Sequence, residues 1–201
     1  MFEQENIVAL YYIGECYEKL GKMDEALRYY ENVLSVDPLF PEAWNGMGVV
    51  MTEQGKLTEA KEMLEKALQL DEDNAEFWYS LGNLHKKMSD KEQDALYCYK
   101  KATELEPYDV EFWLNYADML KVTDSLQAAL DALELATMFI ENDAELLFVL
   151  SAYYYEKGNT EHAINLFKQA VETDAEMVPA FFANCVLNNK DMQAFSSLLT
   201  K

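Results

Sequence analysis

The chain has 201 residues, and half of them are apolar, so it can bury a sizeable core and is not a disordered tail. Its 37 acidic residues outnumber its 16 Lys and Arg residues, and the net charge of −21 disfavours nucleic acid and anionic membrane surfaces as partners. Only 7 Gly and 4 Pro are present, too few for the turns of a many-stranded barrel or sandwich, so long helices are favoured.

Pairs of helices are predicted to follow one another along the chain in repeats of 34 or 35 residues. Spacings of three and four place Trp44, Gly48 and Met51 on one face of a first helix. The same spacings place Ala60 and Leu64 on one face of a second helix. Small residues on both helices allow their axes to approach closely. The predicted repeats span residues 7–40, 41–74, 75–109, 110–143 and 144–177, followed by a shortened repeat at 178–201.

Equivalent positions keep their residue type from repeat to repeat. The large apolar column is Leu10, Trp44, Trp78, Trp113, Leu147 and Phe181. Four places later, the small-residue column is Gly14, Gly48, Gly82, Ala117, Ser151 and Cys185. The turn column is Gly21, Gly55, Ser89, Asp124 and Gly158. The third repeat has one extra residue, which we place in the turn 89–93, because insertions in loops cost little.

These columns resemble the tetratricopeptide repeat family. The match includes Trp44-x2-Met47-Gly48-x2-Met51, followed by Ala60, Leu64 and Ala67. In the first repeat it includes Gly14, Tyr17, Ala26, Tyr30 and Pro38. The resemblance implies an all-α, right-handed superhelical solenoid of antiparallel helix pairs, with about 11 or 12 helices. It also implies that the first helices line a concave groove, in which partners lie as extended peptides or helices.

No catalytic, cofactor or metal motif stands out. His85 shares a column with inward-facing residues and is predicted to be a packed core histidine, while His162 is predicted to be solvated. The run from Asp71 to Asn74 lacks the Gly and the terminal Glu of a calcium loop, and Asn74 is expected to cap the next helix. We therefore expect no enzyme activity, no cofactor and no metal.

The cysteines bear on the compartment. Cys16, Cys98 and Cys185 are far apart and form no CxxC motif, which favours free thiols in a reducing environment. No apolar run approaches the length of a membrane-spanning helix. We expect a cytoplasmic protein that does not bind membranes.

The resemblance places a further set of side chains on the concave groove. These are aromatic, apolar, amide and lysine side chains, and exposed aromatics on a concave face are typical of partner sites. Alternatively, an individual aromatic packs against neighbouring first helices. The predicted groove residues are Tyr11, Asn45, Tyr79, Asn83, Lys86, Leu114, Asn115, Lys121, Phe148 and Tyr155.

The groove does not match the carboxylate clamp with which some members of the family hold chaperone tails. Asn83 and Asn115 match its two asparagines, but Tyr79, Glu145 and Val149 stand where the clamp has cations. Acids outnumber lysines on the groove, which predicts a ligand with basic and apolar residues; alternatively, the acids are only a solvated surface. The acids are Glu15, Glu18, Glu42, Glu53, Glu76, Glu111, Asp118, Glu145 and Glu156, and the lysines are Lys19, Lys86, Lys87 and Lys121.

The leading hypothesis is a non-enzymatic scaffold that binds a peptide or a helical segment of another protein. The alternative is a regulatory segment of a larger enzyme or signalling protein. The shortened repeat at 178–201 is apolar at Met192, Phe195, Leu198 and Leu199 and carries few charges. We expect this end to pack on another copy or on further chain.

Overall fold

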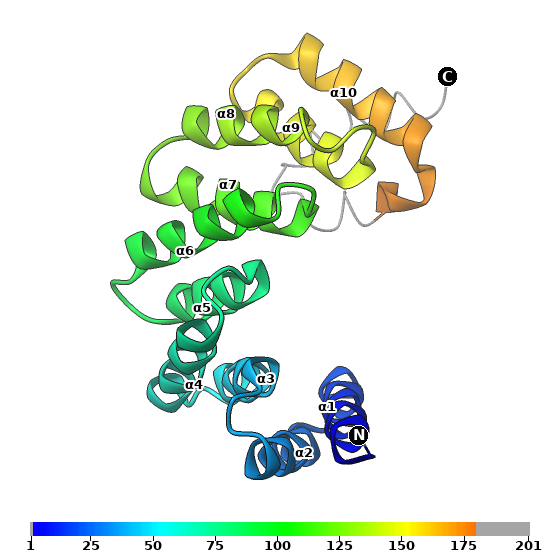
Figure 1. Ribbon diagram of the computed structural model, residues 1–201. Helices are drawn as coiled ribbons and strands as arrows, with labels where there is room; N and C mark the ends of the chain where they lie inside the picture. The colour runs from blue at the N-terminus through cyan, green and yellow to red at the C-terminus, as the bar shows by residue number, and fades with distance from the viewer. Residues whose placement is uncertain (1, 180–201) are drawn as a thin grey trace. The chain divides into compact units, whose positions relative to one another are not determined.

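The computed structural model describes residues 2–179, and this part of the chain is entirely helical (Figure 1). The all-α prediction is confirmed, and the remaining one or two predicted helices of the shortened repeat lie outside the described residues. The helices are α1 (Phe2–Lys19), α2 (Met23–Val36), α3 (Pro41–Glu53), α4 (Leu57–Leu70), α5 (Ala75–Lys87), α6 (Glu92–Leu105), α7 (Val110–Thr123), α8 (Leu126–Ala136), α9 (Ala144–Glu156) and α10 (Thr160–Thr173), followed by the 3-10 helix η1 (Ala175–Met177).

The helices fall into two compact units, an N-terminal unit within Met1–Leu105 and a C-terminal unit within Glu106–Lys201. The N-terminal unit holds the pairs α1–α2, α3–α4 and α5–α6. In it, α2 also packs on α3, and α4 packs on α5. The C-terminal unit holds the pairs α7–α8 and α9–α10. Each pair is therefore one predicted repeat.

Glycine in the small-residue column lets large side chains of the second helices reach far between the first helices. A Cβ atom at Gly48 would lie 2.5 Å from Leu64 Cγ, and one at Gly46 would lie 2.6 Å from Tyr30 Cζ. A Cβ atom at Gly14 would lie 2.7 Å from Tyr30 Cε1. The ring of Tyr30, which is fully buried, thus passes between α1 and α3. The close approach predicted at Gly48 is confirmed.

The turn inside each pair also follows the sequence. Gly21 and Gly55 adopt φ values of 71° and 76°, in the left-handed region that favours glycine. In the third repeat the left-handed residue is Asp90 (φ 58°), one place later than Ser89. The connection 88–91 is one residue longer than 20–22 and 54–56. The extra residue of the third repeat therefore lies in this turn, as predicted.

The tryptophans of the large apolar column join α3, α5 and α7 to the segment that precedes each of these helices. The indole Nε1–H groups of Trp44, Trp78 and Trp113 each donate to the carbonyl oxygen six residues earlier, at 2.8, 2.8 and 2.9 Å. Asn74 accepts a hydrogen bond from the Phe77 amide at 3.4 Å and caps α5, which confirms its predicted role.

Candidate protein-interaction surface

All ten predicted groove residues lie on first helices. Tyr11, Asn45, Tyr79, Asn83 and Lys86 belong to α1, α3 and α5, whose shared surface we call the N-terminal face. Leu114, Asn115, Lys121, Phe148 and Tyr155 belong to α7 and α9, whose shared surface we call the C-terminal face. Lys86 is exposed, and six others are half-buried. The remaining three, Asn45, Tyr79 and Phe148, are buried.

The burial of Tyr79 and Phe148 corrects the expectation that both rings are exposed steps in a groove. Only 8% of Tyr79 and 2% of Phe148 is exposed. Each ring packs on an aromatic of the second helix in its own pair. Tyr79 lies 5.8 Å from Tyr99 and Phe148 lies 5.5 Å from Phe167, measured between ring centroids. These two residues therefore belong to the core, where each packs on the second helix of its own pair.

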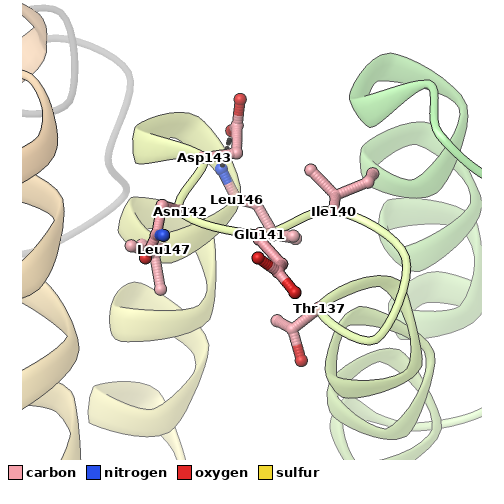
Figure 2. Close-up of a pocket in the computed structure, with 7 residues that line it drawn as sticks. All are labelled: Thr137, Ile140, Glu141, Asn142, Asp143, Leu146 and Leu147. Carbon is pink, nitrogen blue, oxygen red and sulfur yellow. Dashed lines mark hydrogen bonds between the residues drawn. The ribbon is translucent and has the colours of Figure 1, made fainter.

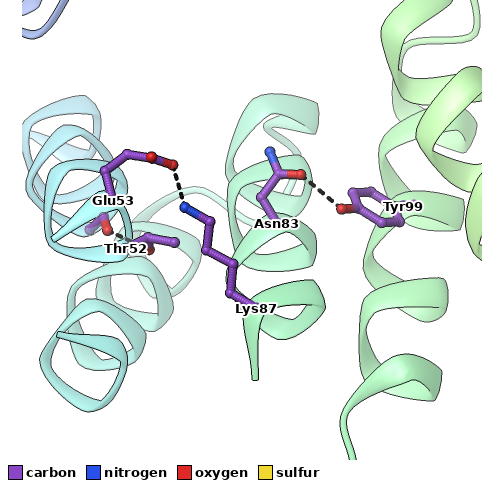
Figure 3. A network of polar contacts seen from close by, with 6 residues as sticks. Thr52, Glu53, Asn83, Lys87 and Tyr99 are labelled. Atoms are coloured by element: carbon purple, nitrogen blue, oxygen red, sulfur yellow. Dashed lines mark hydrogen bonds and ion pairs between the residues drawn. The ribbon is translucent and has the colours of Figure 1, made fainter. Parts of the chain in front are cut away.

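Tyrosine hydroxyl groups donate to polar side chains of the first helices. Tyr30 of α2 donates to Glu18 Oε2 at 2.7 Å, and Tyr99 of α6 donates to Asn83 Oδ1 at 2.8 Å (Figure 3). The repeat pattern did not predict these bonds, because Tyr30 and Tyr99 occupy the position that Leu64 has in the second repeat, where the side chain is apolar. The hydroxyl group of tyrosine at this position was the one feature of the sequence that could have indicated them.

Ion pairs join neighbouring first helices within each unit. Lys87 Nζ lies 2.6 Å from Glu53 Oε1, linking α5 to α3 (Figure 3). Lys121 Nζ lies 2.5 Å from Glu156 Oε2, linking α7 to α9. Because both pairs are partly exposed, each contributes only about 0–1 kcal/mol. Their more important effect is that two predicted groove lysines are already neutralised by acids of the same face.

The acids at the α1 end of the N-terminal face are close enough to influence one another. Glu15 Oε1 accepts a hydrogen bond from the Tyr11 hydroxyl at 3.1 Å. Burial raises the pKa of the Glu18 carboxyl above its usual value; the negative charges of Glu15 and Glu53 add to this rise, and the Tyr30 hydrogen bond opposes it. This end of the face therefore carries crowded carboxylates, and a cation placed there would relieve their repulsion.

The two histidines lie as predicted. His85 is 6% exposed, its Nδ1 atom has no hydrogen-bond partner, and burial lowers its pKa. His162 is exposed on α10. Within residues 7–179, no group of three or more His, Cys, Asp or Glu side chains could hold a metal ion. No helix in the same range is long and apolar enough to cross a membrane.

A pocket of about 280 Å³ lies between the end of α8 and the start of α9 (Figure 2). The connection from α8 to α9 forms much of its wall, and α8 has 11 residues, whereas α2 and α4 have 14. The carboxylate of Asp143 caps α9 through the Leu146 amide at 2.9 Å, so it is already engaged. The lining residues are Thr137, Ile140, Glu141, Asn142, Asp143, Leu146 and Leu147. We assign no functional site to this pocket.

Comparison with known proteins finds relatives that match most of this chain. The human protein O-mannosyl-transferase TMTC3 is 24% identical over 181 residues, which cover 89% of this chain and 20% of that protein. The CTR9 homolog of Arabidopsis thaliana is 28% identical over 174 residues, which cover 81% of this chain and 16% of that protein. The chain thus spans at most about a fifth of these two relatives.

Solved structures share the fold. TTC0263, a thermophilic TPR protein of Thermus thermophilus, superposes with a TM-score of 0.67 at 18% identity, covering 90% of this chain and 100% of that one. YrrB, a TPR protein with an unusual peptide-binding site, superposes with a TM-score of 0.61 at 24% identity, covering 90% and 92%.

Family models match along most of the helical part. A model described as "Tetratricopeptide repeat" matches residues 7–40, and a second of that description matches 75–109 and 144–177. A model described as "TPR repeat" matches residues 50–89. Together with the helix pairs and the structural likeness, these matches show that the chain belongs to the tetratricopeptide repeat family.

Proposed function

We propose that the chain is a non-enzymatic scaffold for protein–protein interaction, and that its first-helix faces bind a peptide or helical segment with basic and apolar residues. The observation that carries this proposal is the proximity of Glu15 and Glu18 on the N-terminal face, where Glu18 is half-buried and accepts from Tyr30 while Glu15 accepts from Tyr11. Burial raises the pKa of Glu18, the charges of Glu15 and of Glu53, which is paired with Lys87, add to this rise, and the Tyr30 hydrogen bond and Lys19 oppose it. A lysine or arginine of a partner would be attracted to this end of the face. Half-buried Tyr11 offers an aromatic surface beside it.

Because Tyr79 and Phe148 are buried, we propose that other residues make the aromatic contacts with a partner. Tyr11 in the N-terminal face and Tyr155 in the C-terminal face are half-buried. Leu114 is also half-buried and adds apolar surface to the C-terminal face. The proposed contacts are thus Tyr11, Leu114 and Tyr155, with the amide and lysine side chains around them.

The test uses two variants with the same change in net charge. Glu15→Gln with Glu18→Gln removes two charges from the N-terminal face, and glutamine still offers an oxygen to Tyr30. Glu59→Gln with Glu62→Gln removes two charges from exposed positions of α4. The probe is a synthetic amphipathic peptide of lysine and leucine, and its comparison is the glutamate–leucine peptide of the same pattern.

Calorimetric titration should show binding of the lysine peptide and weakening of that binding by added salt. The α1 variant should bind about two- to tenfold more weakly, and the α4 variant should match the wild-type chain. Equal loss of affinity in both variants would mean that the peptide responds only to overall charge. Binding of the glutamate peptide with similar affinity would contradict the proposed preference.

A second candidate is a regulatory repeat segment of a larger enzyme or signalling protein, acting in the cytoplasm. This candidate is favoured because the match covers only 20% of the length of one relative and 16% of the length of the other. This candidate uses the same faces, but the partner would be another domain of the same polypeptide. The open reading frame around this sequence would decide between the two.

A further inference from the structure

One side of α1 has the composition of a core but is exposed. Ala9, Tyr12, Ile13 and Cys16 are three or four residues apart and therefore form one stripe along the helix. Tyr12 is 58% exposed and Ile13 is 39% exposed, and Ala9 and Cys16 are also exposed. None of the four carries a charge. We call these four residues the α1 stripe.

The same four columns are buried in the first helices of the next two repeats. In α3 they hold Ala43, Gly46, Met47 and Val50, and in α5 they hold Phe77, Ser80, Leu81 and Leu84; all eight are buried. What buries them is the second helix of the preceding repeat. Gly46 lies against the ring of Tyr30 from α2. Phe77, Leu81 and Leu84 share a core cluster with Leu64, Ala67 and Leu68 of α4.

The α1 stripe is thus a contact surface between repeats that lacks its partner helix in this unit (Figure 1). A repeat that ends an array needs a polar outer face to stay in solution, and α1 offers apolar side chains at these columns instead. A helix suited to the stripe would resemble α2 and α4, with a small residue followed four and seven places later by apolar residues. In α2 these are Ala26, Tyr30 and Val33.

We infer that the α1 stripe is the docking surface for the second helix of a further repeat, joined ahead of α1 in a longer polypeptide. The equivalent columns of α3 and α5 support this occupant, because in both helices the second helix of the preceding repeat covers them. A second copy is a poorer occupant, since two chains of net charge −21 repel each other. A helix joined through a short turn has a high effective concentration and avoids that cost.

The experiment supplies the missing repeat. A copy of residues 41–74 replaces residues 1–6 and is joined directly to Ile7. The 34-residue period then continues across the junction, because the copied Asn74 stands before Ile7 in the same way that Asn74 stands before Ala75 in the chain. The matched control is the same fusion with Tyr12→Lys and Ile13→Lys. The two lysine substitutions are also made in the chain without the fusion, where both positions are exposed and stability should be unchanged.

Hydrogen exchange and urea unfolding are the readouts. The fusion should slow exchange of the α1 amides by about tenfold or more and unfold together with the N-terminal unit. The lysine pair should abolish this protection. An added repeat that unfolds separately, or protection that survives the lysine pair, would overturn the inference.

Light scattering tests whether the α1 stripe binds a second copy of the chain instead of a preceding repeat. The lysine pair should leave the mass of the chain without the fusion unchanged, and one copy of that chain has a mass of 23.2 kDa. A dimer that the lysine pair returns to the monomer would show that the stripe binds another copy, and would overturn the assignment to a preceding repeat.

Discussion

Gly48 offers the sharpest test of how closely α3 and α4 approach. A Cβ atom at this position would lie 2.5 Å from Leu64 Cγ, 2.6 Å from Leu64 Cδ2 and 3.3 Å from the Ala60 carbonyl oxygen. Overpacking of this kind costs about 1–3 kcal/mol, whereas replacing a helical glycine by alanine contributes about 1 kcal/mol of stability. Gly48→Ala should therefore lower the free energy of unfolding by up to about 2 kcal/mol, and Gly48→Leu should lower it further.

A double-mutant cycle isolates the contact. Leu64 is fully buried, so Leu64→Ala alone should cost about 2–5 kcal/mol. In that background the added methyl group has room, and Gly48→Ala should stabilise the chain by up to about 1 kcal/mol. The coupling between the two positions should thus reach about 1–3 kcal/mol.

Urea unfolding followed by far-ultraviolet circular dichroism measures all four corners of the cycle. Gln69→Ala, at an exposed position of α4, is the control and should change stability by less than about 0.5 kcal/mol. If Gly48→Ala stabilises the chain by about 1 kcal/mol while Leu64 is intact, the added methyl group meets no contact, and the two helices do not approach as closely as the glycine column requires.

Three further predictions concern single side chains. Trp78→Phe removes the bond to the Glu72 carbonyl and should cost about 0.5–1.5 kcal/mol in urea unfolding; no loss would make that bond incidental. Burial lowers the pKa of His85, so the unfolded chain binds a proton first and stability should fall as the pH drops below about 6.5. His85→Leu should flatten that part of the curve, and an unaltered curve would contradict the assignment. Burial raises the pKa of the Cys98 thiol to about 12, so a thiol reagent should modify Cys16 in the folded chain and Cys98 only after unfolding; comparable rates at both would refute this.

Periodicity was enough to predict much of the fold. The helix pairs, the extra residue in the third turn and the role of Asn74 all follow from local rules about spacing, glycine and helix caps. Gly48 could be placed at a close contact because a small residue that recurs at the same position of successive helices allows a neighbouring helix to pack closely there. Residues 180–201 lie outside the described residues, so the prediction that Met192, Phe195, Leu198 and Leu199 pack on another copy or on further chain stays a prediction.

The interaction surface was harder to predict, because a column does not fix how far a side chain reaches. Tyr79 and Phe148 stand in the same column as half-buried Tyr11, yet their rings turn onto Tyr99 and Phe167 and leave the surface. The hydroxyl of Tyr30 reaches Glu18 only because glycine flanks its ring on both sides. Such features depend on residues 12 to 20 positions apart, which periodicity alone does not pair.

Backbone amide chemical shifts, recorded while the lysine–leucine peptide is titrated into the full chain, test the central claim most directly. Binding at the N-terminal face predicts that the largest changes fall on the amides of α1, α3 and α5, around Glu15, Glu18 and Glu53, and that α2 and α4 change little. Largest changes on the outer surfaces of α2 and α4 would contradict the account, because the partner would then bind the second helices.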